Sequence, residues 1–466
     1  MGLFNEFDEV SHQQWTEKII KDLKGKDFNE NLVWNSIEGI AVQPFYNNES
    51  IKDNKSKTYH FNSSNADIEN RVVIAIDSIS KANEKALYAL SRGANSIQFE
   101  NKIASQQDFD TLLTNIDITI ISLHFYNATP SQTVDFLNTY CKNKNINPNH
   151  LNGSICYDYL GELLISGDWK ESQNKDLDTL YNISKESLPF KTLAINGLYF
   201  NNAGATSVQE LAYTFSQAVE YLNYLTEKKL DVKTIASSFA FNFGIGSNYF
   251  FEIAKIRAAK ILWNLILKAY NVDSTPIYIN STSTYSNFAC FDQHNNILRT
   301  TTEAMSAIIG GSNSINLLPF DEILDTSTNL SDRIAINITH IINEEAFLNK
   351  VKDASKGSYY IESLTDELVE KSLELFKQLE KNGGFLANIK NGFIQDSIHQ
   401  VAKQKQAKYN TGENTLLGVN KHKSNEGLKM VPVVGPDKTH KNGIIQTLEL
   451  VRFAREIESK EVFKNA

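Results

Sequence analysis

The residues of this chain that could do chemistry are scattered rather than gathered in a motif. Its 466 residues include nine histidines and three cysteines, and their spacing shows no pair of metal ligands on one helix or strand. The sequence also lacks GxxxxGK[ST], GxSxG, HExxH and a strand-linked GxGxxG. We therefore predict no metal site. His124 ends an apolar run and could point to a barrel mouth, but we favour a hydrogen-bonded structural role for it.

Small hydroxyl residues in two of the predicted strands are the second chemical feature. Ser281–Thr284 and Ser312–Ser314 stand where most α/β barrels carry bulky Val, Ile and Leu. Such side chains would leave space and hydrogen-bonding groups along a barrel axis. The alternative is that both segments are loops rich in Ser and Thr at the ends of strands.

Short apolar runs that alternate with helical patterns must position these residues. Eight repeats of a strand followed or preceded by a helix are typical of a parallel (β/α)8 barrel of the TIM type, and a doubly wound open sheet is the alternative. The eight predicted strands are Val72–Ile76, Ser96–Phe99, Ile118–Leu123, Gly153–Tyr157, Thr192–Ile195, Ser237–Phe243, Thr275–Ile279 and Ala307–Leu317. A long helix is predicted from about Ser247, with one broad apolar side.

Three parts are predicted from this pattern. Residues 1–65 form an N-terminal arm, residues 66–385 form the barrel, and residues 386–466 form a C-terminal helical and linker extension. The net charge of −9 gives no sign of nucleic-acid binding. No apolar run reaches the ~20 residues that a membrane helix needs, and the N-terminus has no signal-peptide pattern. We expect a cytoplasmic protein with reduced thiols, since Cys141, Cys156 and Cys290 lie far apart in the sequence.

Several long segments resemble the methylmalonyl-CoA mutase family. They occur in the family's order along the chain, and the two most extensive lie in the predicted second half of the barrel. The similar segments are Glu38–Tyr46 (EGIAVQPFY), Ile195–Leu222, Phe243–Trp263, His294–Ile315, Lys356–Phe376 and Gly412–His422 (GENTLLGVNKH).

This resemblance implies both a fold and a cofactor. Active members of the family use adenosylcobalamin, whose cobalt–carbon bond breaks to supply a radical while the protein binds and orients the substrate. Coenzyme A threads the barrel axis in these members, so Ser281, Thr282 and Ser312 become candidates for an acyl-CoA channel. The cobalamin lies between the carboxyl face of the barrel and a flavodoxin-like domain with a DxHxxG motif.

Departures from the family pattern imply that this chain is not catalytic. The residues after His422 are too few for a doubly wound domain, which needs about 100, so we expect no cobalamin-binding domain. Asp292–Ile297 approaches DxHxxG but lacks its glycine. Tyr199 replaces the His of the family's GYH segment, which hydrogen-bonds the thioester carbonyl, and Asn316 replaces the His of its SLHTN segment. Asn47–Lys57 stands where an RPWT segment is expected.

Taken with these departures, the resemblance implies the small, non-catalytic subunit of a heterodimeric mutase. A large catalytic subunit would be the partner and would hold the adenosylcobalamin, so we predict no catalytic, cofactor-binding or metal residue in this chain. Two alternatives stay open. One is the catalytic barrel of a split acyl-CoA mutase whose cobalamin domain is a separate chain, and the other is an acyl-CoA-binding regulatory protein.

Overall fold

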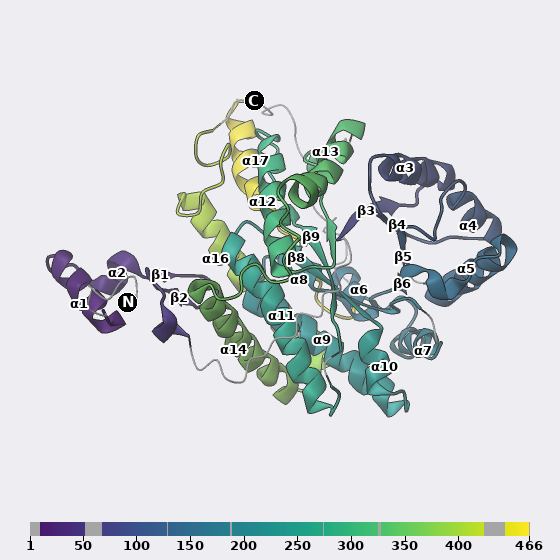
Figure 1. The fold of residues 1–466 in the computed structure, drawn as a ribbon, viewed down its shortest axis with the longest axis horizontal. Helices are drawn as coiled ribbons and strands as arrows, with labels where there is room; N and C mark the ends of the chain where they lie inside the picture. The colour runs from purple at the N-terminus through teal and green to yellow at the C-terminus, as the bar shows by residue number, and fades with distance from the viewer. Residues whose placement is uncertain are drawn as a thin grey trace, which may run out of the picture.

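A computed structural model describes residues 10–51, 68–127, 129–186, 189–273, 275–324, 328–423 and 443–465 (Figure 1). Its centre is a sheet of eight parallel strands. The strands are β3 (Glu69–Ala75), β4 (Ser96–Glu100), β5 (Ser122–Tyr126), β6 (Asn152–Cys156), β7 (Leu193–Asn196), β8 (Phe239–Ile245), β9 (Tyr278–Ser283) and β10 (Ser314–Asn316). Each of the eight predicted strands therefore exists.

The order of the strands makes the sheet a nearly closed barrel. Along the sheet the order is β6-β5-β4-β3-β10-β9-β8-β7, so the first half of the barrel meets the second where β10 pairs with β3. On the other side, β6 and β7 are joined by one parallel bridge between Ser154 and Lys191. The predicted (β/α)8 barrel is confirmed, and the open doubly wound sheet is excluded because the first strand of the sheet, β3, pairs with its last, β10, and the bridge between Ser154 and Lys191 joins the two remaining edges.

Three predicted strands began three or more residues too early: β5, β10, and β9, which begins at Tyr278 rather than at Thr275. Residues 118–121 form a turn rather than a strand, because the Asp117 carboxylate accepts hydrogen bonds from the backbone and hydroxyl of Thr119. The first four residues of the run Ala307–Leu317 are the end of a helix, which stops at Gly311 in a left-handed conformation (φ +83°). Only three residues are left for β10.

Helices surround the barrel, and long ones cover its second half (Figure 1). Those of the barrel and its C-terminal extension are α3 (Ile79–Ser91), α4 (Gln106–Leu112), α5 (Pro130–Lys144), α6 (Tyr159–Ser166), α7 (Gln173–Ser184), α8 (Gly197–Asn202), α9 (Ser207–Glu227), α10 (Val232–Ser237), α11 (Tyr249–Ala269), α12 (Asn295–Gly310), α13 (Asn329–His340), α14 (Tyr359–Lys381), α15 (Gly384–Lys390), α16 (Phe393–Thr411) and α17 (Ala454–Asn465). Helix α14 packs on α9 and α11 and forms a second layer.

Helix α11 is the helix predicted from about Ser247, and it is buried on nearly every side because α14 covers its outer face. Its charged residues are consequently paired. The Lys255 ammonium lies 2.7 Å from Glu210 of α9, and the Arg257 guanidinium lies 2.9 Å from Glu362 of α14. Unpaired buried charges would be costly, so these pairs fix how the three helices lie against one another.

A small N-terminal unit projects from one side of the barrel (Figure 1). It consists of α1 (His12–Asp22), α2 (Phe28–Leu32) and a two-stranded sheet of β1 (Trp34–Asn35) and β2 (Ala41–Val42). No residue of α1 or α2 is buried. The predicted boundary at residue 65 lies outside the described residues, as do residues 424–442 of the predicted linker, so the division into three parts stays a prediction.

Within the described ranges, none of the helices combines the length and apolar character needed to cross a membrane.

Gly153 of β6 offers a test of how closely β6 approaches β5. Its φ is +145°, and a Cβ there would lie 1.7 Å from the carbonyl oxygen of Leu123 in β5. We expect Gly153→Ala to lower the free energy of unfolding by about 3 kcal/mol or more, because backbone atoms of a strand must move. Urea denaturation of the purified chain measures this.

Gly357→Ala is the matched control. Gly357 also has a positive φ (+85°), but nothing lies within 4 Å of its added Cβ, so we expect a loss of about 1–2 kcal/mol from backbone conformation alone. Equal losses in the two variants would show that the approach of β6 to β5 is not tight.

Candidate functional site

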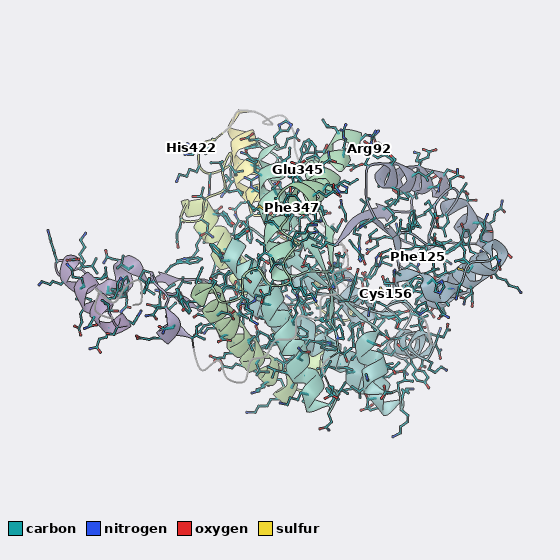
Figure 2. All side chains as sticks on the ribbon, in the orientation of Figure 1. Arg92, Phe125, Cys156, Glu345, Phe347 and His422 are labelled. Atoms are coloured by element: carbon teal, nitrogen blue, oxygen red, sulfur yellow. The ribbon has the colours of Figure 1, made fainter. Side chains whose placement is uncertain are left out.

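A cavity of about 1450 Å³ occupies the barrel and reaches outward between α3 and α13. Its inner lining is polar because alternate strand residues face the axis. In β8, for example, Phe241 and Phe243 pack outward in the hydrophobic core whereas Asn242 lines the cavity. Figure 2 likewise shows Phe125 of β5 on the side of α3–α5, where it packs on Phe109, while Cys156 of β6 lies nearer the centre.

Three asparagines and a tyrosine form a hydrogen-bonded chain around this interior. The Nδ2 of Asn280 donates to Asn242 (2.8 Å), the Nδ2 of Asn242 donates to Asn196 (3.2 Å), and the Nδ2 of Asn196 donates to the Tyr126 hydroxyl (3.0 Å). Asn316 lines the same cavity from β10. None of the three asparagines of the chain was predicted as a site residue, although the presence of an Asn in each of four consecutive strands, with Asn316 in β10, was a visible signal.

The three predicted hydroxyl residues do not share one surface. Thr282 lines the cavity and donates to the Oδ1 of Asn242 over 2.9 Å. Ser281 and Ser312 are both buried and hydrogen-bond to each other over 2.7 Å, and neither lines the cavity. Since neighbouring residues of a strand face opposite sides, Ser281 and Thr282 could not both face the axis. Whether Thr282 contacts an acyl-CoA stays a prediction.

Tyr199 lies at the carboxyl end of the barrel, in α8 directly after β7. Its hydroxyl donates to the Glu162 carboxylate over 2.5 Å, and the Tyr126 hydroxyl donates to the same oxygen over 2.7 Å. Burial, with the nearby Glu162 carboxylate, raises the pKa of Tyr199 well above its ordinary value. The phenol is therefore neutral, and its single proton is held by Glu162.

A second polar cluster crosses the barrel closer to the amino ends of the strands. The Arg71 guanidinium lies 3.0 Å from the Glu69 carboxylate and 2.5 Å from the Tyr278 hydroxyl, and it donates to Gln98 over 3.1 Å. His124 lies 3.0 Å from Glu69. We call Glu69, Arg71, His124 and Tyr278 the axial cluster. These large side chains, from β3, β5 and β9, fill the axis below the asparagines.

Burial sets the protonation of the axial cluster. Burial, followed by the neighbouring Arg71 guanidinium, lowers the pKa of His124 to about 4, so the imidazole is neutral at pH 7. Burial alone would raise the pKa of Glu69, but His124, Arg71 and the Tyr278 hydroxyl hold that pKa well below its ordinary value. A neutral His124 either donates to Glu69 from Nε2 or accepts there from Arg71, and its Nδ1 contacts the Ser154 hydroxyl at 2.9 Å. The structural role expected for His124 agrees with this geometry.

Comparison with known proteins identifies the family. The family model for methylmalonyl-CoA mutase matches residues 101–463. This chain belongs to the methylmalonyl-CoA mutase family. The small subunit of methylmalonyl-CoA mutase from Porphyromonas gingivalis is 34% identical over all of this chain and 78% of its own length.

Full mutases of the family are longer than this chain. The methylmalonyl-CoA mutase of Rhizobium meliloti is 30% identical over 88% of this chain and 64% of its own length, and the human mitochondrial enzyme is 28% identical over 96% and 65%. This chain thus spans under two thirds of these mutases. A solved dihydropteroate synthase from Xanthomonas albilineans aligns over 60% of this chain with a TM-score of 0.34 and 8% identity, and no argument rests on it.

No histidine is among the described residues that line the cavity, so the cavity itself offers no imidazole that could bind a cobalt ion. His294 of the DxHxxG-like segment is exposed, lies directly before α12, and places its ring 5.2 Å from that of Phe320. The described residues form the barrel sheet and the two-stranded sheet, with no second parallel sheet among them.

Acid should weaken the fold through His124. Its pKa is about 4 in the folded chain and about 6.5 when unfolded, so the unfolded chain binds more protons between these values and stability rises with pH across this window. Lowering the pH from 7 to 5 should cost about 2 kcal/mol through this residue. Urea denaturation at both pH values measures the loss.

His124→Asn is the comparison variant, because an amide keeps hydrogen-bonding groups and does not titrate. We expect the pH dependence of its stability between pH 7 and 5 to be smaller than that of the natural chain by about the same amount. An identical dependence in the two chains would mean that His124 is not held neutral.

Proposed function

We propose that this chain is the small, non-catalytic subunit of a heterodimeric methylmalonyl-CoA mutase. Its partner would be a large subunit that binds adenosylcobalamin and interconverts succinyl-CoA and methylmalonyl-CoA, in the cytoplasm. The full-length similarity to a small subunit supports this assignment. The observation that carries the non-catalytic role is the geometry at Tyr199, whose hydroxyl proton is donated to Glu162.

The pair of Tyr199 and Glu162 would hinder stabilisation of a thioester carbonyl. A carbonyl that gains negative charge needs a donor aimed at its oxygen, and the loss of one such donor costs about 10²–10³ in rate. Here the hydroxyl points its proton at a carboxylate, and that carboxylate lies where negative charge would be repelled. Tyr126 cannot substitute, because its proton goes to the same oxygen of Glu162.

The axial cluster argues against passage of coenzyme A through the barrel. An extended ligand on the axis would have to displace Arg71, which is 6% exposed, and separate it from Glu69 and Tyr278. Removing one partner from a buried ion pair leaves a buried charge uncompensated, which typically costs 3–5 kcal/mol. This geometry favours the structural subunit over a split catalytic barrel and over an acyl-CoA-binding regulator.

The N-terminal unit supplies a surface for the large subunit. Val10, Ile20 and Trp34 are 68%, 50% and 51% exposed. Trp15 stacks on Phe45 with ring centroids 5.0 Å apart, but α1 has 11 residues and isolated helices of this length are marginal in water. Large exposed aromatics often anchor interfaces, so a partner that covers this unit would stabilise it.

Co-expression with a candidate large subunit tests the assignment. We expect the two chains to copurify in equal amounts, with cobalamin bound by the large chain alone, because the cobalamin-binding domain is proposed to lie in that chain. Size-exclusion chromatography and the corrin absorbance of the separated chains measure both outcomes. Turnover by this chain alone with added adenosylcobalamin would favour the split enzyme, and measurable affinity of the isolated chain for acyl-CoA would favour the regulator.

Trp34→Ala tests the N-terminal unit separately. Trp34 meets Phe251 edge-on at 5.8 Å but is half exposed, so its loss should change the stability of the isolated chain little. We expect the dissociation constant for the large subunit to rise at least about tenfold, measured by calorimetry or interferometry. Leu265→Ala on α11, 42% exposed, is the control and should leave binding unchanged. Equal binding by the Trp34 variant and the natural chain would place the interface elsewhere.

A further inference from the structure

Residues 443–453, which we call the strap, lie far from the barrel strands in sequence but run across their carboxyl ends. Four backbone N–H groups of the strap donate to carbonyls of elements that follow β6, β7 and β9. They are Ile445 to Gly167 (3.2 Å), Leu448 to Leu164 (2.9 Å), Val451 to Asn202 (2.7 Å) and Phe453 to Ser286 (3.0 Å). The strap is therefore held along most of its length by the rim of the barrel.

Side chains of the strap also pack and pair with the rest of the chain. Ile445 and Leu448 are 6% and 5% exposed and belong to the main hydrophobic core. At the far end, Phe453 stacks on Tyr409 of α16 with centroids 5.0 Å apart. The buried Arg452 guanidinium lies 2.6 Å from Glu458 of α17, whose other carboxylate oxygen accepts from the backbone of Cys290.

The strap crosses the weakest junction of the barrel. Strands β6 and β7 share one bridge, in which Ile155 donates to the Lys191 carbonyl (2.9 Å) and Lys191 donates to the Gly153 carbonyl (3.1 Å). Every other neighbouring pair of barrel strands aligns three or more residues. We call this junction the seam. Gly167 and Leu164 belong to the segment after β6, whereas Asn202 belongs to the segment after β7.

We propose that the strap clamps the seam and keeps the barrel closed at its carboxyl rim. Two of its backbone hydrogen bonds lie on the β6 side and one on the β7 side, so separation of these strands would break bonds on one side or the other. The strap also places Leu450 in the lining of the cavity that Tyr199 lines from α8. This role goes beyond the proposed subunit function and does not depend on it.

A pair of glycines makes the contact possible. A Cβ on Gly443 would lie 2.7 Å from the carbonyl oxygen of Gly167, which is closer than carbon and backbone oxygen normally approach. Gly167 in turn has φ +85°, and a Cβ added there would lie 3.0 Å from the methyl carbon of Thr447. A methyl group added at Gly443 must therefore lift the strap from the β6 side without removing any core side chain.

Hydrogen–deuterium exchange on the full chain tests the clamp. In Gly443→Ala and, separately, Leu448→Ala, we expect the seam amides of Ile155 and Lys191 to exchange at least about tenfold faster. The Ile76 amide, which donates to the Glu100 carbonyl beside the β3–β4 pair on the opposite side of the barrel, should keep its rate. Gly246→Ala is the control, because its Cβ meets Glu252 at an ordinary 3.5 Å on the same rim.

Two results would overturn the clamp. One is an unchanged seam rate in both variants, and the other is equal acceleration at the seam and between β3 and β4, which would mark general destabilisation. A measurement on the natural chain avoids dependence on variants that fold poorly. In low urea, the amides of Val451 and Phe453 should exchange through the same opening reaction as those of Ile155 and Lys191. Exchange of the strap amides while the seam amides stay protected would contradict the proposal.

Discussion

The requirement that buried polar groups find partners governs this barrel. Most of the inward-facing positions of β3, β5, β7, β8 and β9 that line its axis carry amides, hydroxyls or charges rather than the branched apolar residues that fill most barrels. Leaving such groups unpaired would cost about 1–3 kcal/mol each. Many of the interior donors and acceptors pair with one another, and these pairs stabilise the barrel, as the run from Asn280 to Glu162 illustrates.

These hydrogen bonds also limit the chemistry of the interior, because a donor that is already paired is not available to a substrate. A substrate carbonyl is stabilised by a donor that is available and already aimed at it. In this chain the Tyr199 and Tyr126 protons are directed to Glu162, and the Arg71 guanidinium is shared among Glu69, Gln98 and Tyr278. The same hydrogen bonds that hold the barrel together thus leave few groups for catalysis, which supports a subunit whose contribution is structural.

Sequence patterns predicted the fold better than the site. Eight apolar runs with intervening helices were enough for a parallel barrel, because such runs are set by local burial. The side of a strand on which a single residue lies was harder to predict. Ser281 and Thr282 look alike in the sequence, but the register of β9 sends one to Ser312 outside and the other to Asn242 inside. The axial cluster joins residues 69, 71, 124 and 278, and no local pattern relates such distant positions.

The axial cluster and the strap occupy the two places that a ligand passing along the barrel axis would need, the axis itself and the carboxyl rim. A barrel that must admit a long ligand along its axis needs an open channel and a free carboxyl rim. Here Arg71 and its partners fill the axis, and the strap lies over the rim from the segment after β6 to the segment after β9. The seam between β6 and β7 has a single bridge, so its closure depends on further contacts from the chain itself. The strap supplies them where the strands supply only one bridge.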